Sequence, residues 1–373
     1  MENDAMTEQE LEKALRTAAE ADVAVIFAGL PEIFESEGYD RTSMKLPKCQ
    51  DRLIEEVLKV QPNVVVVLHN GSPVELPWAD RVSAILEMYL GGQGVGEACD
   101  RLLFGEANPS GRLAETFPYR LEDNPSFLHF PGNEKRVLYG EDIFVGYRYY
   151  DTKKVPVRYA FGHGLSYTEF TYGDLTLSSA QMTDEDILTV SLKVKNSGKT
   201  EGKEVVQLYV ADLCGTPERP VKELKGFAKV HLLPGEEKTV SMEISARNLS
   251  YYEERLGDWY APSGTYRILI GHASDDIRLH ADIVFKTKKK LPLRVDFTTT
   301  FGELLDHTKT APVITELLAP LAAAAASAEG MSDEYKKLGE QVIREMPLKS
   351  LLGQMPGEQV EQLIGQLNCL LAQ

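Results

Sequence analysis

Four carboxylic acids and one arginine lie within a short segment near the start of this sequence. They are Glu32, Glu35, Glu37, Asp40 and Arg41. The segment follows an apolar run at residues 21–29, typical of a parallel strand covered on both faces, and ligand sites of open α/β sheets gather at the carboxyl ends of such strands. Gly38 would allow a sharp turn, and Arg41 is expected to hold one acid in a bidentate pair. On composition alone, an acidic surface loop is the better interpretation.

Other motifs that mark active sites are defective or missing. Gly92, Gly94 and Gly96 follow a predicted strand, as in a dinucleotide-binding loop, but Glu97 stands where the third glycine belongs, and its charge would face the pyrophosphate. A structural turn is therefore favoured over a nicotinamide enzyme. The sequence contains no Walker loop, no His-Glu-x-x-His and no Gly-x-Ser-x-Gly motif, so phosphoryl transfer, zinc proteolysis and serine hydrolysis lose their usual markers. We expect no cofactor and no metal.

Composition narrows the range of partners. The chain has 57 acidic and 40 basic residues, a net charge of -17, which repels nucleic-acid backbones and anionic lipid surfaces. It contains neither an apolar stretch of about 18 residues that could span a membrane nor a signal peptide pattern. We therefore expect a cytoplasmic protein with no nucleic-acid or membrane partner. The cysteines are far apart, so we expect buried, reduced thiols rather than disulfides or a zinc site; they are Cys49, Cys99, Cys214 and Cys369.

The elements that must position the acidic loop show an α/β pattern. Helical periodicity over residues 7–20 precedes strand-like runs at 21–29, 63–71 and 82–90, and a further helix opens at Pro47. This alternation predicts a parallel sheet with helical crossovers. Three strands are few for such a sheet, so either further strands precede them or a partner supplies them.

The chain of 373 residues is long enough for two or three domains. After the α/β pattern, its composition and hydrophobic periodicity change twice. Residues 121–172 are rich in aromatic side chains, and we expect the run from Tyr147 to Tyr150 to pack between domains rather than to form a sugar platform. His163, between two glycines, is expected to be structural. Residues 173–288 contain about seven short alternating runs, the pattern of an immunoglobulin-like sandwich.

The last part, residues 289–373, is predicted to be a helical tail. A basic linker precedes helical patterns at residues 301–307, 313–330, 332–346 and 357–373. The last of these carries an apolar stripe that must be buried, against the chain's own domains or a second copy.

A longer set of motifs points to a family. Ser36-Glu37-Gly38-Tyr39-Asp40-Arg41 is followed by Leu46-Pro47 and Gln50, and then in order by HNGSPVELPW, GGQGVGEA, LLFGEANPSGRLAETFP, EDIFVGYRYYD, YAFGHGLSYTEF and ELKGFAKVHLLPGE. Over residues 21–285 these segments closely resemble family 3 glycoside hydrolases, the β-glucosidase-like enzymes. In that family a (β/α)8 barrel precedes an α/β sandwich domain and a fibronectin type III-like domain.

This resemblance implies a domain order for the chain. Residues 1–120 would be a partial α/β sandwich domain, residues 121–172 an aromatic-rich connecting segment, and residues 173–288 a fibronectin type III-like β-sandwich. Residues 289–373 would be a helical tail of the kind that some bacterial members carry.

The resemblance also implies a mechanism. The family hydrolyses terminal β-linked sugars with retention of configuration, using one ionised and one protonated carboxyl group about 5 Å apart. By resemblance Glu37 is the acid/base on a loop that reaches the barrel, supported by Ser36, Gly38, Asp40 and Arg41. The nucleophile is a barrel aspartate without a counterpart here. Gly257-Asp258-Trp259 resembles the family segment that carries this nucleophile only superficially. We interpret it as a turn with a packing tryptophan.

The leading hypothesis is a C-terminal portion or split subunit of a retaining β-glycosidase that is inactive alone. Its substrate would be a β-linked glucoside, a related oligosaccharide or an aryl glycoside. Its protein partner would be a (β/α)8 barrel domain in cis or in trans, and association into a homo-oligomer is a further possibility. The alternative is a non-catalytic interaction or carbohydrate-binding module that keeps the fold. Copurification with a barrel-containing polypeptide would favour the first.

Overall fold

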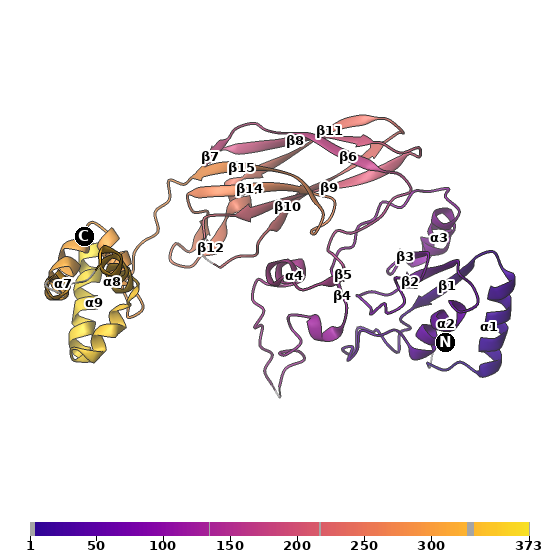
Figure 1. Ribbon diagram of the computed structural model, residues 1–373, viewed down its shortest axis with the longest axis horizontal. Helices are drawn as coiled ribbons and strands as arrows, with labels where there is room; N and C mark the ends of the chain where they lie inside the picture. The colour runs from indigo at the N-terminus through magenta and orange to yellow at the C-terminus, as the bar shows by residue number, and fades with distance from the viewer. Residues whose placement is uncertain (1–3, 134, 216–217, 327–331, 373) are drawn as a thin grey trace. The chain divides into compact units, whose positions relative to one another are not determined.

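A computed structural model describes residues 4–133, 135–215, 218–326 and 332–372 (Figure 1). The chain forms two compact units, Met1–Ser250 with Ala261–Lys288, and Tyr251–Tyr260 with Lys289–Gln373. The first contains an α/β domain and a β-sandwich, and the second is mainly helical. This confirms the predicted fold class, α/β plus all-β with a helical C-terminal part.

The α/β domain is built on a three-stranded parallel sheet of order β1-β2-β3. Its elements are α1 (Glu8–Glu20), β1 (Ala24–Gly29), α2 (Lys48–Val57), β2 (Val64–His69), β3 (Ala84–Glu87) and α3 (Val95–Leu103). The register places Ile26, Val66 and Ile85 side by side on one face. Ala18 of α1 and Ile54 of α2 belong to the same core cluster, so these helices cover that face. The parallel sheet predicted from the apolar runs is confirmed.

Two expectations about this sheet are wrong. Residues 70–83, between β2 and β3, contain no helix; Pro73 and Pro77 lack the N–H groups that a helix needs, and the connection instead buries Trp78 in the core. The first strand is also not covered on both faces. Val25 and Phe27, on the face opposite the helices, are 42% and 61% exposed, and among the described residues β1 pairs only with β2. The chain thus leaves one edge and one face of the sheet open at β1.

The β-sandwich consists of a five-stranded sheet of order β10-β9-β14-β15-β7 and a three-stranded sheet of order β11-β8-β6. The strands are β6 (Phe170–Leu177), β7 (Gln181–Thr183), β8 (Ile187–Asn196), β9 (Gly202–Asp212), β10 (Glu223–Leu232), β11 (Glu237–Ser245), β14 (Gly264–Gly271) and β15 (Ile277–Lys286), with the short helix α5 (Ala246–Leu249) after β11. Leu188, Val190, Leu192 and Val194 of β8 all enter the core, because alternate residues of a strand share a face. The alternating runs of the sequence therefore predicted the sandwich correctly.

The connecting segment packs its rings much as expected. It contains the 3-10 turn Leu121–Asp123, the helix α4 (Tyr147–Lys153) and β5 (Val157–Tyr159), which pairs with β4 (Phe117–Pro118) just before the segment. The Tyr147 ring stacks on Phe161 with centroids 4.7 Å apart, and its hydroxyl accepts a hydrogen bond from the Leu224 N–H in β10 at 2.8 Å. The His163 ring stacks on Tyr159 at 5.0 Å, and burial lowers its pKa. These contacts hold the rings of Tyr147 and His163 in the packing of the segment.

The helical unit has a core of its own. It contains the hairpin β12 (Tyr251–Glu253) and β13 (Asp258–Tyr260), then α6 (Phe301–Asp306), α7 (Ala311–Ala326), α8 (Asp333–Glu345), the 3-10 turn Leu348–Gly353 and α9 (Gly357–Ala372). Residues 327–330 and Gln373, expected to be helical, lie outside the described residues. Val360 and Leu367 of the α9 stripe are fully buried beside Phe301 and Leu304. The stripe thus packs on the other helices of the same unit.

Two smaller expectations about local structure need correction. Asp258 and Trp259 form a strand of the β12–β13 hairpin rather than a turn in the sandwich. Of the four free cysteines, Cys49 and Cys99 are buried and Cys214 is partly buried, but Cys369 is exposed, because it lies off the apolar stripe of α9.

Within the described residues, no helix has the length and apolar character needed to cross a membrane.

The buried stripe leads to a stability prediction. Leu367→Ala should lower the unfolding free energy of the helical unit by about 2–5 kcal/mol, because it leaves a cavity among fully packed side chains. Gln366→Ala, at the neighbouring exposed position, should change it by less than about 0.5 kcal/mol. Urea unfolding followed by far-ultraviolet circular dichroism measures both. Equal stability of the two variants would show that the stripe does not hold the unit together.

Candidate active site

The acidic loop leaves the carboxyl end of β1, at a position fixed by two side-chain hydrogen bonds. Gln50 of α2 accepts from the Gly29 N–H at 2.8 Å and donates to the Gly29 carbonyl at 2.9 Å. A Cβ atom at Gly29 would lie 2.0 Å from the carbonyl oxygen of His69, so only glycine fits this close approach of β1 to β2. The motif residue Gln50 therefore pins the point from which the loop begins.

Glu35 is not a solvated side chain but an anchored one. Its Oε2 accepts from the Gly71 N–H at 2.6 Å, and its Oε1 accepts from the Ser72 hydroxyl at 2.5 Å. Arg41 Nη1 lies 3.5 Å from Glu35 Oε1 and donates to Ser72 Oγ at 2.7 Å and to the Pro73 carbonyl at 3.3 Å. Both side chains are largely buried: 20% of the Glu35 side chain and 16% of the Arg41 side chain are exposed. The loop is thus tied to the turn that follows β2.

Glu37, at the tip of the same loop, is exposed. The tip is closed by a β-bridge between Ser36 and Tyr39 and by a hydrogen bond from the Tyr39 hydroxyl to the Glu32 carbonyl at 2.6 Å. Within the ranges that the structure describes, the Glu37 carboxyl group has no hydrogen bond or ion pair from this chain. This carboxyl group therefore faces solvent.

Two expectations about loop geometry are corrected here. Arg41 approaches Glu35 with one nitrogen at 3.5 Å rather than in a bidentate pair, because Ser72 occupies the space between them. Gly38 has no left-handed backbone conformation, and a Cβ atom there would contact nothing within 4 Å. Asp40 and Glu32 are exposed, and Ser36 Oγ accepts from the Gly38 N–H at 3.4 Å.

Two further carboxyl groups, those of Glu87 and Glu115, interact electrostatically with Glu35. Burial raises the pKa of Glu87, at the end of β3, to about 7, and the charges of Glu115 and Glu35 add to this effect. Burial also raises the pKa of Glu115, assisted by Glu35 and opposed by Arg41. Glu35 and Glu115 therefore share the charge of Arg41, and the charges of both also act on Glu87 at the end of β3. Sequence patterns gave no role to Glu87, Glu115 or Ser72; the available signals were a charged residue closing an apolar strand and the motif turn HNGSP.

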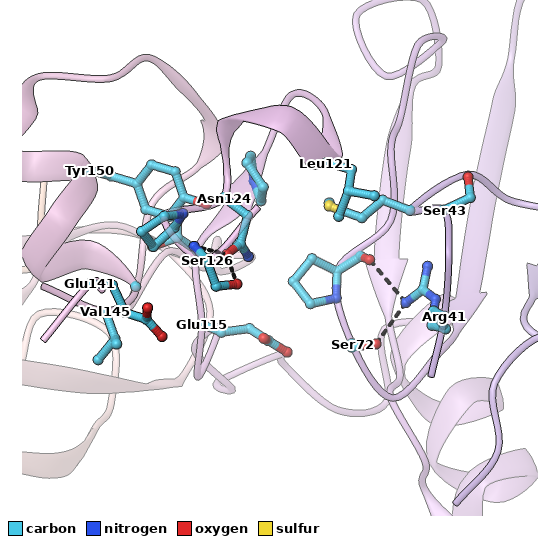
Figure 2. A pocket seen from close by; sticks show the side chains of 16 residues that line it. Arg41, Ser43, Ser72, Glu115, Leu121, Asn124, Ser126, Glu141, Val145 and Tyr150 are labelled. Atoms are coloured by element: carbon cyan, nitrogen blue, oxygen red, sulfur yellow. Dashed lines mark hydrogen bonds between the residues drawn. The ribbon is translucent and has the colours of Figure 1, made fainter. Parts of the chain in front are cut away.

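A pocket of about 380 Å³ with a mixed polar and apolar lining opens beside Arg41. Figure 2 shows the Glu115 carboxyl group extending between the Arg41 side and the Glu141 side of the pocket. Its other labelled lining residues are Ser43, Ser72, Leu121, Asn124, Ser126, Val145 and Tyr150. Of the predicted loop residues, Arg41 lines this pocket, whereas Glu37 does not.

The other sequence candidate, the glycine-rich segment, forms a turn before a helix. Gly92–Gly94 form a 3-10 turn that leads into α3, and Gly92 has a φ of 64° that favours glycine. Among the described residues, no group of three or more histidine, cysteine, aspartate or glutamate side chains could hold a metal ion.

Comparison with known proteins agrees with the motifs. Residues 1–167 match the family described as glycosyl hydrolase family 3 C-terminal domain, and residues 204–274 match the fibronectin type III-like domain. The chain belongs to glycoside hydrolase family 3. It corresponds to the C-terminal part of the β-glucosidases of this family.

Individual relatives extend over much more sequence than this chain. It is 47% identical over 372 residues to thermostable beta-glucosidase B of Acetivibrio thermocellus, covering 99% of this chain and 49% of that protein. The crystal structure of the Bifidobacterium adolescentis family 3 beta-glucosidase superposes with a TM-score of 0.77 at 38% identity, over 83% of this chain and 46% of that one. Beta-glucosidase from Kluyveromyces marxianus in complex with glucose gives a TM-score of 0.71 at 42% identity, over 76% and 34%. The chain thus spans between a third and a half of these relatives.

Proposed function

We propose that this chain is the acid/base-bearing part of a retaining β-glycosidase that hydrolyses terminal β-linked glucosides. Glu37 protonates the departing oxygen in the first step and activates water in the second. The nucleophile comes from a (β/α)8 barrel, in cis within a longer chain or in trans on another polypeptide. The chain described here has no useful activity by itself.

The contrast between Glu35 and Glu37 carries this proposal. An acid/base must exchange its proton with substrate, so its carboxyl group cannot be committed to the fold. Glu35 uses both oxygens to accept hydrogen bonds from Gly71 and Ser72. Glu37 is exposed on a loop that is anchored on both sides of it. Of the two neighbouring glutamates, only Glu37 is available for chemistry.

The open side of the sheet supports a partner. Parallel sheets are covered on both faces, yet Val23, Val25 and Phe27 are 49%, 42% and 61% exposed. The edge of β1 opposite β2 also has no partner strand within the described chain. A polypeptide that supplies a parallel strand here, together with the barrel, would cover the apolar face and bring the nucleophile toward Glu37.

Complementation tests the proposal. The chain should not hydrolyse 4-nitrophenyl β-glucoside alone, and should do so when mixed with a polypeptide carrying the upstream barrel and strands of the Acetivibrio thermocellus relative. Phe27→Asp should weaken this activation at least tenfold, since it places a charge in the covered face. Val60→Asp, at an apolar position that is 42% exposed between α2 and β2, is the matched control and should leave the activation unchanged. Complex formation without hydrolysis would favour a non-catalytic interaction module instead.

A further inference from the structure

The loop that carries Glu37 has few connections to the rest of the domain. At its start the Leu30 N–H donates to the His69 carbonyl at 3.0 Å, and near its end the Glu75 N–H donates to the Met44 carbonyl at 2.8 Å. The contacts of Tyr39 and Ser36 close the tip on itself. Between the two ends, Glu35 and Arg41 hold the loop to the rest of the domain through polar side-chain contacts.

These two residues converge on one hydroxyl group. The Ser72 hydroxyl donates a hydrogen bond to Glu35 Oε1 and accepts one from Arg41 Nη1, so its single donor is used toward Glu35 and one of its two lone pairs toward Arg41. The Gly71 N–H adds a second bond to Glu35. Because Glu35 lies two residues before Glu37 and Arg41 four residues after it, the anchor holds both sides of the tip.

The anchor surrounds the carboxyl group of Glu35 with hydrogen-bond donors and a positive charge. Its two oxygens face an N–H and an O–H, both donors, while a guanidinium stands 3.5 Å away. Such charge-assisted bonds are stronger than neutral ones. A glutamine keeps the size of the side chain but has only one acceptor oxygen, so its NH2 group either faces the Gly71 N–H or takes the Ser72 hydroxyl out of its donor role, and the charge opposite Arg41 is lost. Glu35→Gln therefore weakens the anchor with little change in volume.

We propose that Glu35, acting through Ser72 and Gly71, is a positioning residue that sets the place of the Glu37 carboxyl group relative to the glycosidic oxygen. This inference rests on the proposed role of Glu37. If Glu35 only solvated the loop, Glu35→Gln would change neither loop order nor turnover by much. Glu35 touches no substrate in this role; it limits the movement of the residue that does.

Loop order is the first test and needs no activity. Amide hydrogen exchange of the full chain should show peptides spanning residues 36–43 exchanging at least about tenfold faster in Glu35→Gln and Ser72→Ala than in the parent, because a local opening has become easier. Peptides from β1 and β2 should be unchanged. Glu32→Gln, on the same loop at an exposed position, is the matched control. Unchanged exchange in both anchor variants would overturn the anchor, whatever Glu37 does.

Leaving-group dependence in the assembled enzyme is the second test. Glu35→Gln should lower kcat for glucosides with poor leaving groups by about 10- to 100-fold through misplacement of the acid, and should affect 2,4-dinitrophenyl β-glucoside much less, with KM nearly constant. Azide should not restore the rate, since Glu37 is still present. Faster loop exchange with normal turnover would overturn the positioning role. Full activity of Glu37→Gln, measured in parallel, would instead remove the proposed function and leave the exchange result to decide the anchor.

Discussion

Glu37→Gln should reduce turnover of β-glucosides with poor leaving groups by about 10²- to 10⁴-fold in the assembled enzyme, because the departing oxygen then receives no proton. Aryl glucosides with activated leaving groups need no proton in the first step, so their glycosylation should be partly spared. Their deglycosylation should still be slow, since the same residue activates water. Steady-state kinetics over a series of aryl glucosides, with a pre-steady-state burst for the most activated one, measures both steps.

Azide distinguishes a missing acid/base from a damaged fold. It attacks the glycosyl intermediate without general-base help, so it should accelerate Glu37→Gln and yield a glucosyl azide of retained configuration. Glu32→Gln is the control on the same exposed loop and should keep normal turnover. Azide rescue in Glu35→Gln rather than in Glu37→Gln would transfer the catalytic role to position 35. Normal activity of Glu37→Gln would exclude the loop from the chemistry.

Arg112→Ala should be the most destabilising substitution considered, with a loss of about 3–5 kcal/mol, because it leaves a buried charge without its partner. Glu204 is fully buried in β9. Its Oε1 accepts from Arg112 Nη2 at 3.0 Å and lies 3.1 Å from His272 Nδ1. The other ring nitrogen of His272 lies 2.9 Å from the Gly164 carbonyl. This network joins Arg112, which precedes the connecting segment, and Gly164 within that segment to the sandwich.

Urea unfolding of the chain and its variants measures this loss. Arg267→Ala provides the control, because Arg267 pairs with Asp282 on the exposed surface of the same sandwich, with 39% and 44% of the side chains exposed, and such pairs contribute about 1 kcal/mol or less. Similar losses in the two variants would show that burial adds nothing to the network.

The same network should make stability depend on pH. Burial alone would raise the pKa of Glu204, but the hydrogen bond of His272 and the charge of Arg112 outweigh it, and the pKa lies below its ordinary value of 4.5. A lowered pKa stabilises the fold above the unfolded-state value and loses this contribution as the pH falls through the folded value. Glu204→Gln should therefore flatten the decline in stability below about pH 4.5, measured by thermal unfolding across pH.

The amino-acid sequence by itself determined the architecture, because the signals are periodic and local. Continuous apolar runs indicated buried parallel strands, alternating runs such as residues 187–196 indicated the sandwich, and the spacing of Val360, Leu363 and Leu367 indicated a helix with one buried face. The ordered motifs around Glu37 also identified the family. These features depend on neighbours in the sequence, so no folded structure was needed to find them.

Only the tertiary structure separated the roles of Glu35 and Glu37. Both are glutamates on one acidic loop, and nothing in their spacing shows that one meets Gly71 and Ser72, more than thirty residues away, while the other points to solvent. Glu87 likewise interacts with Glu35 because parallel strands end at the same edge of the sheet, and the segment before β4 adds Glu115. The open face at Phe27 was hidden for the same reason: an apolar run looks identical whether the chain or a partner covers it. Burial and long-range pairing are properties of the fold, and they decide which carboxyl group is bonded to the turn after β2 and which stays exposed.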